Sequence, residues 1–179
     1  MLIKTIISGF GGQGVLFMGY CIATAAMDED YHTTYLPSYG PEVRGGTANC
    51  TVAVSDETIA SPVASQPDFV VAMNNPSLVR FQSHLTSNGI LFLNTDLVDI
   101  EPYRGDINVV RVPAVSLAAD IGNPKGMNVV MLGAFLQHTR LIDYNSMENA
   151  VRKIFSEKSA KLVEPNLLAL KTGFEYTGD

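Results

Sequence analysis

The sequence predicts an α/β fold, with a single doubly wound, mostly parallel sheet and helices on both faces. Three observations predict it. Short apolar runs alternate with stretches of helical apolar spacing, two of the runs are uninterrupted, as in strands buried on both faces, and the first run passes through a glycine-rich turn into a helical stretch. The chain has 179 residues, 46% of them hydrophobic, and no Pro/Gly/Ser-rich linker, so we expect one domain over residues 1–179. This arrangement is Rossmann-like.

The first part of the chain supplies three expected strands and one helix. Residues 2–7 form an apolar run, and residues 15–27 carry apolar side chains at helical spacing. Residues 32–36 have strand composition, and residues 47–54 show the alternation of a β-branched strand. The last two segments are candidates to pair as neighbouring strands.

The middle of the chain repeats the alternation of strand and helix. Residues 69–73 and 90–93 are continuous apolar runs, which suits strands buried on both faces. Between them, residues 76–85 are expected to form a helix with Asn75 as its cap and proline in its first position.

The last part of the chain is expected to be mainly helical. A short strand at residues 109–112 precedes a helical turn at residues 116–120. A largely buried helix is expected to begin at Met127, because its apolar residues cover more than one face. Asn145 is the expected cap of the next helix, and the final helix is expected to open at Pro165.

Charge and hydropathy argue against several function classes. The formal net charge is −6 and the sequence pI is about 5.0, whereas nucleic acids and anionic membranes select basic surfaces. No segment reaches the roughly 18 consecutive apolar residues of a membrane span, and the first apolar run is too short for a signal peptide. We therefore expect a soluble, cytoplasmic protein with no nucleic-acid or membrane partner.

The sequence contains no metal-binding motif. There are two cysteines, Cys21 and Cys50, with no C-x-x-C pair, and the three histidines are scattered. Two cysteines cannot complete a four-cysteine zinc site or an iron-sulfur cluster. We expect both to be small buried hydrophobic side chains, and we expect no metal site.

The turn after the first strand has the spacing G-x-G-x-x-G. It consists of Gly9, Phe10, Gly11, Gly12, Gln13 and Gly14. Bare backbone N–H groups at the positive end of a helix attract anions, so the turn is a candidate phosphate cradle. A nicotinamide-binding unit would also need an acid at the end of its second strand. Asp28, Glu29 and Asp30 precede that strand instead, so the pattern leaves the nucleotide undetermined.

A second glycine-rich loop, residues 39–46, follows the second expected strand. It places Glu42 and Arg44 among glycines and a proline. Ligands of open α/β sheets bind at the carboxyl ends of the strands, and the first glycine turn lies at that same edge. Arg44 is a candidate to clamp a phosphate or carboxylate, with Glu42 orienting it. An ordinary surface turn is the alternative.

Together the two loops resemble the gamma subunit of the 2-oxoacid:ferredoxin (acceptor) oxidoreductases. The resemblance covers most of the chain and includes residues 9–14, residues 38–46, residues 123–125, Asn128 and Gly133. It is strongest to the subunit of 2-oxoglutarate enzymes, with branched-chain 2-oxoacid and indolepyruvate enzymes as alternatives.

The resemblance implies a subunit that cannot catalyse the reaction alone. Such complexes decarboxylate a 2-oxoacid on thiamine diphosphate and magnesium, pass electrons through iron-sulfur clusters to ferredoxin or a similar acceptor, and release an acyl-CoA. This chain has neither a Gly-Asp-Gly diphosphate motif nor enough cysteines for a cluster, so those cofactors are expected on partner subunits. The resemblance assigns it no catalytic residue, but coenzyme A binding and a subunit interface.

By this resemblance the coenzyme A site combines the two loops. The implied residues are Gly9, Gly11, Gly12, Gln13, Gly14, Tyr39, Glu42 and Arg44. A glycine cradle suits the phosphates of coenzyme A without the missing ribose-binding acid. Two other classes stay open, namely a stand-alone NAD- or flavin-binding oxidoreductase and an interaction subunit whose glycine turn is only structural.

Overall fold

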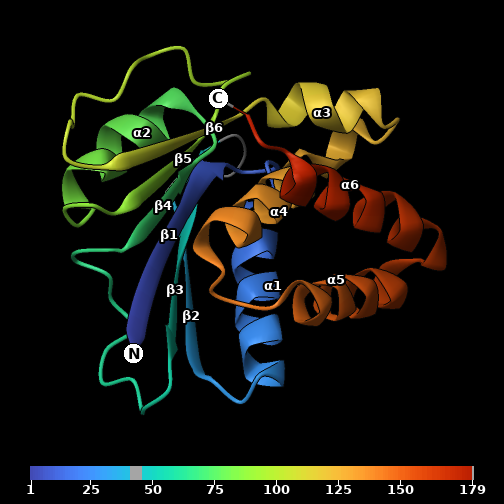
Figure 1. The fold of residues 1–179 in the computed structure, drawn as a ribbon, viewed down its shortest axis with the longest axis horizontal. Coiled ribbons are helices and arrows are strands. Elements are labelled where there is room, and N and C mark those ends of the chain that lie inside the picture. The colour runs from blue at the N-terminus through green and yellow to red at the C-terminus, as the bar shows by residue number, and fades with distance from the viewer. Residues whose placement is uncertain (41–45, 179) are drawn as a thin grey trace.

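The computed structural model describes residues 1–40 and 46–178, and its centre is a six-stranded sheet in the order β2-β3-β1-β4-β5-β6 (Figure 1). The strands are β1 (Leu2–Phe10), β2 (His32–Tyr39), β3 (Thr47–Ser55), β4 (Phe69–Ala72), β5 (Ile90–Asn94) and β6 (Asn108–Val112). The strands β1, β4, β5 and β6 are parallel, whereas β3 is antiparallel to both of its neighbours. The predicted α/β fold with a mostly parallel sheet is therefore confirmed.

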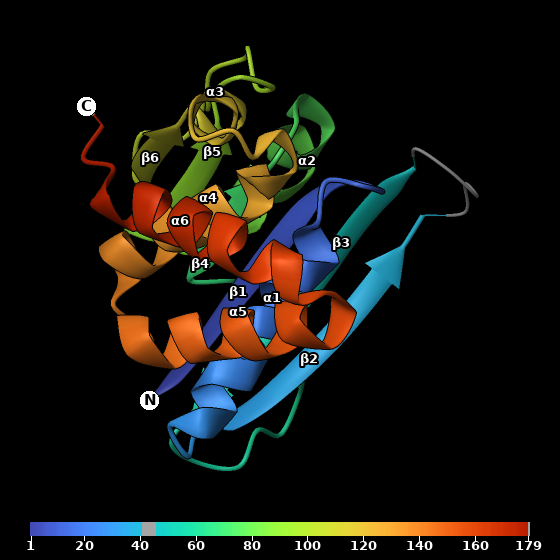
Figure 2. The same ribbon diagram turned by 90° about the vertical axis from the view of Figure 1, so that its right-hand side faces the viewer.

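Helices cover both faces of the sheet, but unequally. The helices are α1 (Val15–Asp28), α2 (Asn75–Phe81), α3 (Ala114–Asp120), α4 (Met127–Thr139), α5 (Tyr144–Lys158) and α6 (Val163–Glu175), with short 3-10 helices η1 (Gln82–His84), η2 (Pro124–Gly126) and η3 (Ala160–Leu162). In Figure 1, α2 lies on one side of the sheet, and α1, α4, α5 and α6 lie on the other. Figure 2 shows this larger layer in front of the sheet, with β2 along one edge.

Side chains of the central strands alternate between the two helical layers. Val70 and Leu91 belong to the apolar cluster that includes Leu78 of α2. Their chain neighbours Val71 and Phe92 belong to the larger cluster with α1 and α4. Both faces of these strands are buried, which explains why the sequence shows continuous apolar runs there.

The predicted pairing of the second and third strands is confirmed. In this hairpin, β2 and β3 are antiparallel in a register that pairs His32 with Ser55 and Tyr39 with Ala48. The strand β2 is longer than the sequence predicts, because pairing with β3 continues to Tyr39. Since β3 runs back between β2 and β1, the carboxyl ends of β1 and β2 lie at the same edge of the sheet.

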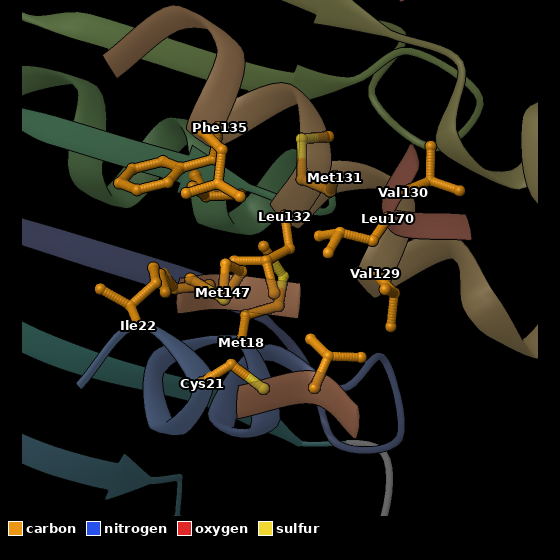
Figure 3. Packing of buried hydrophobic residues seen from close by; sticks show 14 of the residues in the cluster. Met18, Cys21, Ile22, Val129, Val130, Met131, Leu132, Phe135, Met147 and Leu170 are labelled. Carbon is orange, nitrogen blue, oxygen red and sulfur yellow. The ribbon is translucent and has the colours of Figure 1, made fainter. Parts of the chain in front are cut away.

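The core of the larger layer is formed where four helices meet. In Figure 3, Ile22 from α1, Leu132 from α4, Met147 from α5 and Leu170 from α6 lie close together, and all four are fully buried. The helix α4 is enclosed on nearly all sides, because every residue from Asn128 to Leu136 is buried. This confirms the predicted buried helix.

The helices α4 and α6 approach so closely that two side chains must be absent. A Cβ atom on Gly133 would overlap the backbone of Leu170, and one on Gly173 would overlap the backbone of Val130. Glycine at both positions therefore allows backbone contact between the helices.

Two predicted helix caps are wrong. The cap of α2 is Asn74, whose side-chain oxygen accepts from the N–H of Ser77 at 3.0 Å, and Asn75 is already helical. The cap of α5 is Asp143, which accepts from the N–H of Asn145 at 2.8 Å. The helix α6 begins at Val163, before Pro165. For both caps the sequence offers nearby residues of similar type, and the backbone conformation selects one.

Within residues 1–40 and 46–178, no helix is both long enough and apolar enough to cross a bilayer.

We predict that Gly133→Ala destabilises the fold by about 1–3 kcal/mol, because the added methyl group forces α4 and α6 apart. Alanine is the better helix former by about 1 kcal/mol, so a loss of stability can come only from the overlap. The measurement is urea unfolding followed by circular dichroism. The control is Gly105→Ala, where a Cβ meets no atom within 4 Å. Equal midpoints for the two variants would contradict the prediction.

Candidate functional site

The glycine turn between β1 and α1 has a backbone that only glycine adopts easily. The φ angle is +98° at Gly12 and +75° at Gly14, both in the left-handed region. These two residues turn the chain from the end of β1 at Phe10 into the start of α1 at Val15. The predicted sequence of strand, glycine turn and helix is confirmed.

Several backbone N–H groups of the turn have no acceptor within residues 1–40 and 46–178. Gly14 is the N-cap of α1 without a side-chain cap bond, and the first helical turn has no acidic residue. Among the described residues, no backbone carbonyl accepts from the N–H groups of Gly12, Gly14 or Val15. The N–H of Gly11 donates instead to the carbonyl oxygen of Gly46 at 2.9 Å. The free donors lie at the positive end of a helix, where an anion is stabilised.

A hollow of about 240 Å³ lies against this turn. It is lined by Phe10, Gly11, Gly12, Gly14, Val15, Leu16, Tyr39 and Ala48. Ala48 of β3 pairs with Tyr39 on one side and with Gly9 of β1 on the other. The structure therefore brings Tyr39 to the glycine turn, at the edge where the sequence predicts it.

The hollow combines a polar and an apolar surface. Its surface is mainly apolar, with Phe10, Leu16 and the 73% exposed Tyr39 among its lining residues, and the backbone of the glycine turn borders it. A ligand that joins a phosphate to an apolar or aromatic group matches both parts. Glu42 and Arg44 lie outside the described residues, so their place at this edge stays a prediction.

The side chain of Gln13 turns away from this hollow. Its Oε1 accepts from the backbone N–H of Phe10 at 2.6 Å and from Nδ2 of Asn74 at 3.0 Å. Its Nε2 donates to the carbonyl oxygen of Met73 at 3.3 Å. The sequence predicts a ligand contact for Gln13, and the structure shows that its amide is already used within the protein.

The start of α4 packs on the glycine turn. Asn128 is buried, and its Nδ2 donates to the carbonyl oxygen of Gly14 at 3.4 Å. A Cβ atom on Gly14 would lie within 2.6 Å of the Asn128 side chain. Lys125, just before α4, is exposed. The sequence includes Asn128 in the family resemblance, but nothing in it indicates this contact, because the two residues are distant in the chain.

The described residues near the turn offer no reactive thiol and no metal site. Burial raises the pKa of Cys50 to about 12 and raises the pKa of Cys21 still further, so both behave as the predicted buried hydrophobic side chains. Burial, with Cys50 and Tyr39 nearby, also raises the pKa of Tyr35 to about 12, and its hydroxyl donates to the carbonyl oxygen of Leu16 at 3.0 Å. Within the described ranges no group of three or more His, Cys, Asp or Glu side chains could hold a metal.

A larger hollow of about 560 Å³ lies where α4 ends and α5 begins, and Arg140, Asp143 and Phe174 are among its lining residues. The start of α5 is already capped there by Asp143. The carboxylate of Asp143 thus already occupies this helix start, where it would repel a second anion, and we place the candidate site at the smaller hollow.

Comparison with known proteins identifies the family. The family model described as pyruvate ferredoxin/flavodoxin oxidoreductase matches residues 4–176. The chain belongs to this family. The resemblance predicted from the paired loops is thus confirmed.

Two relatives show how the family members differ in length. The chain is 38% identical to ketoisovalerate oxidoreductase subunit VorA of Methanothermobacter marburgensis, over 97% of this chain and 36% of that protein. It is 31% identical to 2-oxoglutarate synthase subunit KorC of Methanocaldococcus jannaschii, over 94% of this chain and 90% of that protein. The chain thus spans about a third of VorA and nearly all of KorC.

A solved structure supports the same family and fold. The gamma subunit of a keto/oxoacid ferredoxin oxidoreductase from Geobacter sulfurreducens PCA superimposes with a TM-score of 0.86 at 29% identity. The similarity covers 98% of this chain and 95% of that subunit. The glycine turn therefore lies in a fold shared with a gamma subunit over nearly its whole length.

We predict that neither cysteine reacts with DTNB in the folded protein at pH 8, and that two thiols per chain react in guanidinium. The thiolate is the reactive form, and a thiol with a pKa of about 12 is ionised to only about one part in ten thousand at pH 8. The positive control is Ser83→Cys, which places a thiol at an exposed position of η1. Rapid reaction of a native cysteine would contradict this assignment.

Proposed function

We propose that the chain is the gamma subunit of a 2-oxoacid:ferredoxin (acceptor) oxidoreductase, in which it contributes coenzyme A binding and part of a subunit interface. The complex would oxidatively decarboxylate a 2-oxoacid to an acyl-CoA, and 2-oxoglutarate is the substrate that we propose. The observation that carries the proposal is the glycine turn beside Tyr39, whose N–H groups at Gly12 and Gly14 find no acceptor in the part of the chain that the structure describes, in a member of this family. Residues 1–179 would form one gamma-type domain in the cytoplasm.

The remaining chemistry belongs to partner subunits in this proposal. Thiamine diphosphate, magnesium and iron-sulfur clusters would be bound by other chains. Both cysteines of this chain are buried, and among the described residues no group of three or more His, Cys, Asp or Glu side chains could hold a metal ion. Electrons would pass to ferredoxin or a similar acceptor. The relatives VorA and KorC are themselves named as subunits, of a ketoisovalerate oxidoreductase and of a 2-oxoglutarate synthase, which supports this division.

The site matches the parts of coenzyme A. Its pyrophosphate would accept hydrogen bonds from the N–H groups of Gly12 and Gly14, while its apolar or aromatic part would lie against Tyr39 in the hollow. Arg44, with Glu42 to orient it, would add a bidentate phosphate contact from the second loop. The chain itself would bind and orient the substrate, and the thiamine cofactor would supply the carbon chemistry.

A stand-alone NAD-dependent enzyme is the weaker candidate. Asp28 lies at the last residue of α1, and a helix of 14 residues is roughly 20 Å long, so this acid is remote from the turn at the other end. The relatives do not decide the 2-oxoacid, since they are named for ketoisovalerate as well as 2-oxoglutarate. A branched-chain or an indolepyruvate enzyme therefore stands as the alternative.

The experiment that tests the proposal is an anaerobic pull-down of this chain from its own cells. Mass spectrometry would identify the partners, and dye reduction would be assayed with coenzyme A and 2-oxoglutarate, ketoisovalerate or indolepyruvate in parallel. We expect thiamine-binding and cluster-binding partners and coenzyme A-dependent activity. A chain that is recovered alone and binds NAD or flavin would refute the proposal.

We predict that Arg44→Ala and Gly12→Val each raise the KM for coenzyme A about tenfold in the assembled enzyme, which corresponds to about 1.4 kcal/mol of binding free energy. Valine at φ +98° adds about 1–3 kcal/mol of strain, which is less than the usual 5–15 kcal/mol of stability, so the subunit should stay folded.

The control for these variants is Arg80→Ala, because Arg80 lies on α2 and stacks over Phe81, away from the glycine turn. Steady-state kinetics at varied coenzyme A would measure KM in all three. If neither site variant differs from the control, the assigned coenzyme A site is wrong.

A further inference from the structure

The sheet of this protein has a topological switch point between β1 and β4. These two strands are parallel neighbours, but β1 continues into α1 on one face and β4 continues into α2 on the other (Figure 1). Where the chains after neighbouring strands diverge in this way, a crevice opens at the carboxyl ends of the strands. Open α/β sheets ordinarily bind their ligands in that crevice.

In this chain the Gln13 side chain bridges the two strands at the switch point. It accepts hydrogen bonds from the N–H of Phe10, at the end of β1, and from the side chain of Asn74. It donates one to the carbonyl oxygen of Met73, and both Met73 and Asn74 follow β4. The Oε1 atom accepts two hydrogen bonds and the Nε2 atom donates one. A glutamate at this position could not donate to Met73, and an asparagine, which is one methylene shorter, could not reach all three partners.

The surrounding residues are arranged around this bridge. A Cβ atom on Gly9 would lie 2.6 Å from Oε1 of Gln13, so glycine at this position makes room for the amide. Asn74 is 3% exposed, and it also caps α2 through the N–H of Ser77. The hydroxyl of Ser77 in turn lies 2.9 Å from that of Ser8 in β1. The glycine turn is thus tied to α2 by a nearly buried hydrogen-bond network.

The hollow beside the turn lies on the other side of β1. Its lining includes Tyr39 of β2 and Ala48 of β3, but not Gln13, Met73 or Asn74. Among the described residues, the turn therefore borders a hollow on the side toward β3, while the side toward β4 is bridged by Gln13.

We propose that Gln13 is a positioning residue that closes the switch-point crevice and thereby directs the phosphate-bearing ligand to the β3 side of the glycine turn. This inference rests on the proposed coenzyme A site. Gln13 acts by holding the turn in the conformation in which the N–H groups of Gly12 and Gly14 are presented, so binding does not have to order the loop. It makes no contact with the ligand.

The first test compares Gln13→Ala and Gln13→Met in the assembled enzyme, with Gln66→Ala at an exposed position as the matched control. Neither replacement can make the three hydrogen bonds, although methionine fills the same space. We expect both to raise the KM for coenzyme A about tenfold and to change kcat less than twofold, because the loss of a few net hydrogen bonds weakens binding by about that much. Gln66→Ala should resemble the wild type.

A purely structural role would give a different result. Both variants would then lower the melting temperature but leave the KM for coenzyme A at the wild-type value, and that result would overturn the proposal. A fall in kcat with an unchanged KM would also overturn it, because Gln13 would then act on a step after binding.

The second test locates the ligand by hydrogen exchange of the wild-type protein with and without coenzyme A. We expect protection in residues 9–17 and 46–50, and none in residues 73–77. Protection of residues 73–77 would overturn the inference but support the coenzyme A site, since the ligand would then lie in the crevice. Absence of protection in all three segments would refute the proposed function, and the inference would fall with it.

Discussion

The left-handed backbone at Gly12 and Gly14 is the constraint on which the rest of the structure depends. The strand β1 lies between β3 and β4 in the sheet, and the turn after it decides the direction in which α1 leaves. With these φ angles, α1 returns across β3, where Gly19 lets the helix approach the Sγ atom of Cys50. The helices α4 and α5 then pack on α1 (Figure 3). A side chain at either turn position would require a conformation that L-residues rarely adopt.

Glycines allow close packing at several points of the larger layer. Gly14 accommodates Asn128 at the start of α4, and Gly133 and Gly173 allow α4 and α6 to touch through their backbones. The candidate site is therefore continuous with the core, because the turn that presents the N–H groups is also a packing surface for α4. This continuity favours a rigid turn, since a shift of α4 would be opposed by close packing along its whole length.

The pattern of apolar residues was sufficient to predict the strands and most helices. Residues 69–73 and 90–93 are apolar on both faces because α2 covers one side and α4 the other, and such runs can be recognised locally. The caps were harder. Asn74 and Asn75 are equivalent by composition, and only the extended backbone of Asn74, with φ −162° and ψ 168°, makes it the cap. Asp143 was missed because Asn145, two residues later, is of a similar type.

The sequence by itself determined the glycine turn, because positive φ angles are a local property that only glycine adopts without strain. It also predicted that Tyr39 lies at the same edge, because the second loop follows the carboxyl end of the second strand of an open α/β sheet. The strand order of the structure agrees with this. The tertiary structure decided where Gln13 points. Its partners Met73 and Asn74 lie 60 and 61 residues further along the chain, so no local pattern connects them. Folding alone brings β4 beside β1, and the side chain then satisfies the polar groups exposed at that junction.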